Sequence, residues 1–95
     1  MIYEWDPKKA TANLLRHGVS FDEAASVFLD PLAVTFPDPD HSGREFREIT
    51  IGHSARQRVI FLSHLRRGDR TRLISARKAT RRERKQYEES ISEEK

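Results

Sequence analysis

Two apolar, β-prone runs joined by a short glycine-containing connection constrain the fold of this chain more than any other feature. The runs are "RVIFLSHL" (58–65) and "RTRLISA" (70–76), and the linking residues are "RRGD", with Gly68 in the connection. β-prone runs separated by a short turn are typical of a β-hairpin. The chain is therefore expected to contain a mostly antiparallel sheet built around this hairpin.

Two helices are predicted before the middle of the chain, after a short strand "IYEW". The first helix lies within "DPKKATANLLRHG", because Asp6 is a favourable N-cap and Gly18 is a typical C-terminal stop. The second lies within "SFDEAASVF", where Ser20 and Glu23 have capping-box spacing. This helix should end before Pro31, because the residue preceding a proline is disfavoured in the helical region.

The remaining elements complete an α+β pattern. Strands "LAVTF" and "FREITIGH" flank the turn-rich loop "PDPDHSG" (37–43), and a last helix is predicted from the capping box of Thr80 and Glu83 to about Ile91. The predicted order is β-α-α-β-β-β-β-α. We expect one domain over residues 1–95, with a small antiparallel sheet packed against two N-terminal helices and one C-terminal helix.

Positive charge is concentrated in the C-terminal third of the chain. From Arg66 to Lys85 there are ten Lys or Arg and two acids, a net charge of +8, whereas the other residues carry eight bases and thirteen acids, a net charge of −5. A segment polarised to this extent attracts polyanions.

The charges of the last helix are placed against its dipole. Arg81 and Arg82 fall in the first turn, where acids are favoured, and acids fill the last turns, so each misplaced charge costs about 0.3–1 kcal/mol when exposed. A phosphate bound at the helix N-terminus would explain the arrangement, and the alternative is tolerated surface charge that aids solubility. The further basic cluster of Arg66, Arg67 and Arg70 favours RNA or DNA.

Several kinds of site are unsupported by the sequence. There are no cysteines, no histidines in metal-ligand spacing, and no glycine-rich nucleotide-binding motif, so neither a metal nor a cofactor is expected. No apolar run approaches the length of a membrane span or forms a signal peptide, so a soluble cytoplasmic domain is expected.

RNA can be cleaved by a protein that offers only cationic side chains and a proton carrier, and this chain contains both. RNA supplies its own nucleophile, the 2′-hydroxyl, so the protein has only to orient that group, remove its proton and stabilise the negative phosphorane. Arginines and one histidine or tyrosine suffice for this chemistry, without a metal ion.

Candidate residues in the strands also have structural alternatives. If Leu65 and Arg70 close the hairpin, His64 and Arg72 point to opposite faces unless a bulge intervenes. His64 could then be a hydrogen-bonded rim residue rather than a proton carrier.

Arg47 and His53 fall on one side of the strand "FREITIGH", and a half-buried arginine there needs an anionic partner, either protein or RNA. Arg72 could instead form a structural ion pair with Glu48 or Glu83. For His17, which precedes the helix-stopping glycine, the structural alternative is a cation at a helix C-terminus.

Three stretches resemble one known family: "DPKKATANLLRHGVSFDEAASVF", "REITIG" and "RGDRTRLISARKATRRERKQYEE". They are similar to BrnT, the toxin of the BrnT–BrnA type II toxin–antitoxin systems, over about residues 4 to 89. The resemblance implies a RelE-like fold and a ribonuclease activity that arrests translation and growth. It also implies a BrnA-like antitoxin with a ribbon-helix-helix DNA-binding part, and a complex, expected to contain two toxins and two antitoxins, that binds operator DNA. The positions that match the family's motifs are His17, Arg47, Arg72, Ser75, Arg77, Glu83 and Tyr87.

Combining the charge pattern with this resemblance, we expect a metal-independent endoribonuclease toxin. Arg47, Arg72 and Arg77 are predicted to hold the scissile phosphate, and His64 or Tyr87 to move protons. The residues predicted to grip the RNA backbone are Arg66, Arg67, Arg70, Arg81 and Arg82.

Two other functions fit the same sequence. One is a non-catalytic module that binds nucleic acid through its basic stripe, and the other is an inactive toxin relic retained as a co-repressor.

Overall fold

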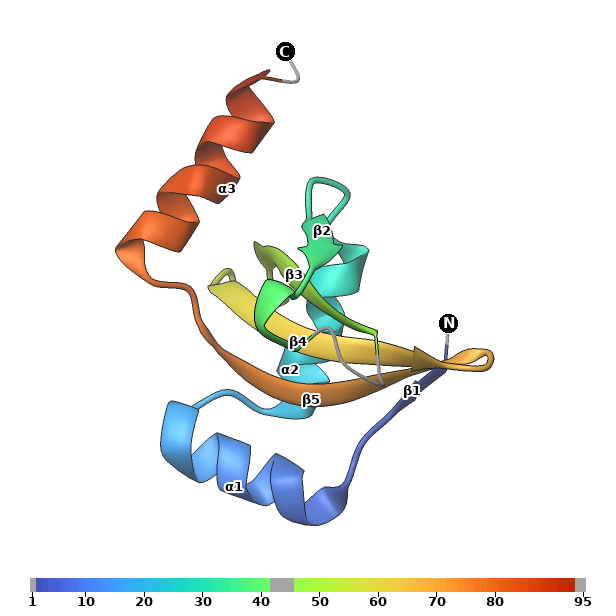
Figure 1. Cartoon of the computed structure of the whole chain (residues 1–95). Coiled ribbons are helices and arrows are strands. Elements are labelled where there is room, and N and C mark those ends of the chain that lie inside the picture. The colour runs from blue at the N-terminus through green and yellow to red at the C-terminus, as the bar shows by residue number, and fades with distance from the viewer. Residues whose placement is uncertain (1, 42–45, 94–95) are drawn as a thin grey trace.

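The computed structural model describes residues 2–41 and 46–93 (Figure 1), so the end of the predicted loop 37–43 lies outside the described residues. The strands are β1 (Ile2–Glu4), β2 (Val34–Pro37), β3 (Arg47–His53), β4 (Val59–Arg67) and β5 (Arg70–Lys78). The helices are α1 (Pro7–His17), α2 (Phe21–Ala25) and α3 (Arg81–Glu93), with short 3-10 turns η1 (Ser26–Leu29) and η2 (Pro39–His41). The predicted order of helices and strands is confirmed.

The five strands form one mixed sheet in the order β1-β5-β4-β3-β2. Strands β2 to β5 pair antiparallel with their neighbours, as expected, whereas β1 runs parallel to β5. No short turn joins β1 to β5, so nothing forces the antiparallel direction that a hairpin imposes.

The hairpin between β4 and β5 closes at Arg67 and Arg70, not at Leu65 and Arg70. The tip is therefore a two-residue turn, and Gly68 adopts the positive φ of 60° that such tight turns require.

A register shift lies further along the same hairpin. Ser63 pairs with Ser75 and His64 with Leu73, so Ile74 is an extra residue on β5. Such a β-bulge locally changes the direction of side chains.

The sheet has two faces that are covered to different extents. On the face that we call the covered face, α1, α2 and η1 pack over a continuous apolar core (Figure 1). The residues of this core are Val19, Phe21, Ala24, Ala25, Val27, Ile60, Leu62, Leu73 and Ala76. On the other side, which we call the open face, a smaller cluster contains Ile49, Ile51 and Tyr87, with Val34, Val59, Phe61 and Ile91 packed against it.

The covered face is fixed in part by a buried asparagine. Asn13 of α1 donates to the carbonyl oxygens of Ala76 (2.8 Å) and Val19 (3.0 Å), and its side-chain oxygen accepts from the backbone amide of Ala76 (3.0 Å). Because the nitrogen and the oxygen of the side-chain amide are both hydrogen-bonded, the amide can be buried without a large free-energy cost, and the bonds to Ala76 hold α1 against β5. No helix in the described ranges is long and apolar enough to cross a membrane.

Candidate nucleic-acid interface and its polar groups

The sheet brings the three arginines predicted to hold phosphate to the open face. Arg47 on β3 and Arg72 on β5 both lie opposite Leu65 of β4, and Arg77 lies opposite Phe61. Residues opposite one another across neighbouring strands project to the same side, which is the side of the Phe61 cluster. The shared face follows from strand pairing that the sequence alone did not specify.

Two of these arginines already have carboxylate partners. The Arg72 guanidinium donates to Glu4 at 2.9 Å, and Arg77 makes two hydrogen bonds to Glu83 at 2.8 and 3.0 Å. Neither acid considered for Arg72 from the sequence is its partner, because parallel pairing places Glu4 directly beside it. The hydrogen bonds from Arg77 hold the pKa of Glu83 below its ordinary value.

Arg47 differs from the other two arginines. It is half-buried, and it forms no ion pair with any residue in the described ranges 2–41 and 46–93. Arg47 is on β3 and Arg72 is on β5, with β4 between them, so the two backbones are about 10 Å apart. Long side chains can bridge that gap, so these two guanidinium groups can contact one phosphate above Leu65.

His64 lies away from these arginines, as the strand alternation predicted. Its side chain is on the covered side, where the ring packs edge-on against Phe28 and a ring nitrogen is 2.7 Å from the Thr50 hydroxyl oxygen. Only 4% of the residue is exposed, and this burial lowers its pKa to about 4. The imidazole is therefore neutral and enclosed at pH 7, and its proposed catalytic role stays a prediction.

Tyr87 holds α3 against the open face. It is 1% exposed, and its hydroxyl donates to an Asp30 carboxylate oxygen at 2.5 Å. Burial, and then the hydrogen bond and charge of Asp30, raise the pKa of Tyr87 above its ordinary value. The phenol therefore keeps its proton at neutral pH, which suits it to holding a neighbouring group in place.

The arginines predicted to grip RNA form two groups rather than one patch. Arg66, Arg67 and Arg70 are exposed at the hairpin tip, whereas Arg81 and Arg82 are exposed at the start of α3. The hairpin tip and the start of α3 lie far apart in Figure 1. The two groups lie at opposite ends of β5, about 26 Å apart for eight residues of extended chain. A nucleic acid that contacted both would have to run along the sheet.

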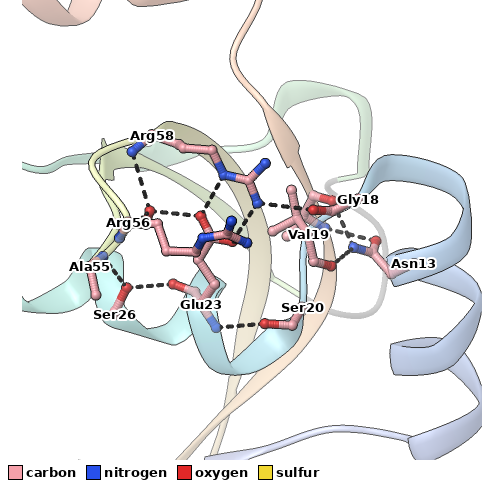
Figure 2. Close-up of polar contacts among 11 residues, drawn as sticks. Asn13, Gly18, Val19, Ser20, Glu23, Ser26, Ala55, Arg56 and Arg58 are labelled. Carbon is pink, nitrogen blue, oxygen red and sulfur yellow. Dashed lines mark hydrogen bonds and ion pairs between the residues drawn. The ribbon is translucent and has the colours of Figure 1, made fainter.

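A buried charge network that the sequence analysis missed lies beside the covered face (Figure 2). The Glu23 carboxylate accepts from Ser54 at 2.7 Å and from the guanidinium of Arg58 through two nitrogens. Arg58 also donates to the carbonyl oxygen of Gly18 at 2.9 Å. The predicted capping box is thus half-formed: the Ser20 hydroxyl accepts from the Glu23 amide, but the carboxylate turns inward to Arg58.

The hydrogen bonds from Arg58 hold the pKa of Glu23 below its ordinary value, although burial acts to raise it. Because the carboxylate is saturated by these bonds, we assign it a structural role. The partners are separated by 35 residues, and no local pattern in the sequence could have paired them.

A second group of polar residues joins η1, β3 and α3. One Asp30 oxygen accepts from the Tyr87 hydroxyl and from the backbone amide of His53 (2.8 Å), and the other accepts from the Leu32 amide (2.9 Å). Burial acts to raise the pKa of Asp30, but these hydrogen bonds outweigh it and the pKa is lowered. The His53 ring nitrogen Nδ1 lies 3.1 Å from the Tyr87 hydroxyl oxygen. The one sequence signal for this group was the position of His53 on the Arg47 side of its strand.

The other matching positions lie elsewhere. Ser75 and His17 line a hollow of about 360 Å³ between α1 and β5, together with Lys9 and Arg16. Within the described part of the chain, no group of three or more His, Asp or Glu side chains is arranged to hold a metal ion.

The fold and the open face together define a small α+β protein whose sheet displays arginines, an arrangement suited to a polyanionic ligand. Residues 5–83 match the family model described as "Ribonuclease toxin, BrnT, of type II toxin-antitoxin system". The chain therefore belongs to the BrnT family of ribonuclease toxins of type II toxin–antitoxin systems.

The structure is similar to the crystal structure of the Brucella abortus ribonuclease toxin BrnT, with a TM-score of 0.66 and 22% sequence identity. The match covers 85% of this chain and 100% of that one, and it confirms the predicted α+β fold. No curated protein sequence matches the chain.

Proposed function

We propose that this chain is an endoribonuclease that cleaves RNA in the cytoplasm without a metal ion and thereby arrests translation and growth. The family supplies the ribonuclease class. The observation that carries the proposal is the open face itself, on which Arg47, Arg72 and Arg77 all project, with Arg47 free of ion pairs among the described residues.

The proposed reaction uses the 2′-hydroxyl of RNA as its nucleophile. A proton carrier activates that hydroxyl, which contributes about 10²- to 10⁴-fold to the rate. Guanidinium groups stabilise the charge that develops on the phosphorane, and loss of one such donor costs about 10²- to 10³-fold. Arg47 and Arg72 bind phosphate in this proposal, with Arg72 exchanging part of its bond to Glu4 for the ligand.

Purified protein incubated with RNA and EDTA tests the proposal directly. We expect cleavage with EDTA present, no stimulation by added Mg²⁺ or Zn²⁺, and fragments that end in 2′,3′-cyclic phosphate and 5′-hydroxyl groups. Cleavage that appears only when Mg²⁺ is restored would contradict metal independence. Intact free RNA beside cleaved ribosome-bound RNA would contradict direct action on free RNA.

We further propose a BrnA-like antitoxin as the partner, with a ribbon-helix-helix part that binds operator DNA. Membership of a type II toxin–antitoxin family supports an antitoxin partner. We propose that the complex contains two toxins and two antitoxins. Co-expression should relieve growth arrest, and the mass of the purified complex should equal that of the 2:2 assembly. Growth arrest that persists with the neighbouring antitoxin gene expressed would contradict this pairing.

One observation favours a non-catalytic function as the second candidate. Arg72 and Arg77 are bonded to Glu4 and Glu83 in the free chain, as expected of arginines that only stabilise the fold. A binding module or co-repressor predicts that Arg72→Ala lowers RNA binding and growth arrest in proportion. The enzyme predicts at least one substitution that abolishes arrest while RNA and antitoxin binding stay near normal. Expression of the chain alone without any growth defect would favour the co-repressor.

A further inference from the structure

A basic hollow lies at the α3 end of the sheet, far from the hairpin tip, and is lined by residues from both sides of it: His53 projects to the open face, whereas Lys78 lies opposite Ile60 of the covered face. It has a volume of about 360 Å³, and we call it the His53 hollow because His53 lines it, together with Lys78, Arg84 and Glu88. Lys78 and Arg84 are exposed, and neither forms an ion pair within the described ranges. Arg58 also lines the hollow but is bound to Glu23. The hollow therefore has two cations available for a phosphate.

The hydrogen bonds around His53 fix which ring nitrogen carries a proton. The single hydroxyl proton of Tyr87 is donated to Asp30, so the hydroxyl oxygen can only accept from the neighbouring Nδ1 of His53, 3.1 Å away. Neutral His53 is thereby held with its proton on Nδ1 and with the lone pair of Nε2 unused. That form of the ring is the one required of a general base.

His53 also has the access and the support that a proton carrier needs. Its side chain is 43% exposed, in contrast to the enclosed His64. The Asp30 carboxylate lies 3.9 Å from Nδ1, so a negative charge faces this side of the ring. The side chain thus combines solvent access, a fixed tautomer and a nearby counter-charge.

We propose that His53 is the catalytic proton carrier of the ribonuclease, with the scissile phosphate bound in the His53 hollow by Lys78 and Arg84. Asp30 and Tyr87 are positioning residues that act through His53. This inference rests on the proposed ribonuclease function and assigns its chemistry to the end of the sheet beside α3.

The proposed step is a transphosphorylation. His53 Nε2 removes the proton of the 2′-hydroxyl as the bond from the 2′-oxygen to phosphorus forms and the bond from phosphorus to the 5′-oxygen breaks. Solvent supplies one proton to the departing 5′-oxygen and later takes one from the imidazolium, so no net proton is gained or lost. The products are a 2′,3′-cyclic phosphate and a 5′-hydroxyl.

The same assignment gives the open-face arginines a different task from the one predicted. His53 lies six positions after Arg47 on β3, which corresponds to about 20 Å in an extended strand. Arg47 and Arg72 therefore bind the same RNA several nucleotides from the point of cleavage, and their contribution is to affinity.

The test compares two histidines on opposite faces, His53→Ala and His17→Ala, in cleavage of an end-labelled oligoribonucleotide with EDTA present. We expect His53→Ala to lower kcat by about 10²- to 10⁴-fold. Its affinity for a 2′-O-methyl analogue of the substrate and its melting temperature should stay near those of the wild type. Imidazole added to the buffer should restore part of its activity, and His17→Ala should cleave at the wild-type rate.

A second pair of variants tests the positioning role. Tyr87→Phe keeps the ring that anchors α3 but removes the acceptor for His53, whereas Ile91→Ala loosens α3 and leaves the hydroxyl in place. We expect Tyr87→Phe to lower kcat more than tenfold with KM within twofold, and Ile91→Ala to change kcat less than threefold. Equal losses in both variants would mean that Tyr87 only holds the helix, which overturns its positioning role.

The outcomes separate this inference from the proposal on which it rests. A wild-type protein that cleaves no RNA overturns the proposed metal-independent activity and this assignment with it. A cleaving wild type with His53→Ala within threefold of it overturns the His53 assignment alone. Loss of activity in His17→Ala would instead place the chemistry in the α1 hollow, and failure of imidazole to rescue a folded His53→Ala would make His53 structural.

Discussion

The two faces of the sheet differ in how completely helices cover them and in which polar groups remain at the surface. On the covered face, two helices bury a continuous apolar core, and each buried side-chain nitrogen or oxygen among the described residues has a hydrogen-bond partner, including those of Asn13 and Glu23. On the open face, α3 packs mainly through Tyr87 and Ile91, and arginines remain at the surface. Substitutions on the covered face are therefore expected to change folding stability, and those on the open face are expected to change RNA binding.

Two histidines in neighbouring strands make the contrast concrete. His64 of β4 is enclosed on the covered side, where burial favours its neutral form, whereas the side chain of His53 of β3 is partly exposed at the end of the open face. The residue type is the same, and the difference in exposure comes from what packs over each ring. Coverage of the face, more than residue identity, decides how much of a histidine ring solvent can reach.

The largest expected effect is on the covered face. Glu23→Ala should lower the free energy of unfolding by about 3–5 kcal/mol, because it leaves the Arg58 charge without its partner in a largely buried site. Urea denaturation measures this loss. Glu89→Ala, at an exposed position on α3, is the matched control and should change stability by no more than about 0.5 kcal/mol. Similar small effects in both variants would show that the buried network is not what stabilises the covered face.

The next effect is a pH dependence from His64. The folded-state pKa of about 4 lies below the ordinary value of 6.5, so the unfolded chain takes up the proton first as the pH falls. Stability from this residue is complete above about pH 6.5 and is lost as the pH drops to 4, a change of roughly 3 kcal/mol. Urea denaturation at several pH values should show the decline, and His64→Gln should flatten it. If the unfolding free energy of His64→Gln falls with pH as steeply as that of the wild type, the folded protein does not hold His64 in its neutral form.

The smallest of the three effects is on the open face. Arg47→Ala should weaken binding of a 2′-O-methyl RNA roughly tenfold at low salt and make the salt dependence of log K shallower by about 0.7, as expected for one lost phosphate contact on a single strand. Its unfolding free energy should change little. Arg16→Ala, an exposed arginine on α1, is the control and should bind as the wild type does. Equal losses in the two variants would remove the distinction between the faces.

Local patterns predicted the elements well where the signal lies within a few residues. The Asp6 cap, the Gly18 stop with φ of 70°, and the reciprocal bonds of Thr80 and Glu83 are all confirmed. The Ser20–Glu23 box shows the limit of this reasoning, because a distant arginine competes for the carboxylate. A sequence motif specifies which bonds are possible, and the packed neighbours determine which of them form.

Pairing of distant strands decided the rest of the candidate site. The sequence alternation of β3 correctly placed Arg47 and His53 on one side, but it gave no information on Tyr87 or Asp30, which reach His53 from 34 and 23 residues away. The partner of Arg72 was missed for the same reason, since β1 and β5 come together only in the folded sheet.

The amino-acid sequence by itself determined the order of helices and strands, the hairpin and the excess of positive charge near the C-terminus, because these depend on contacts between residues close along the chain. The tertiary structure alone decided which face each cation occupies and which histidine is open to solvent. Those properties depend on sheet register and on helix coverage, and both are set by contacts between residues that are far apart in sequence.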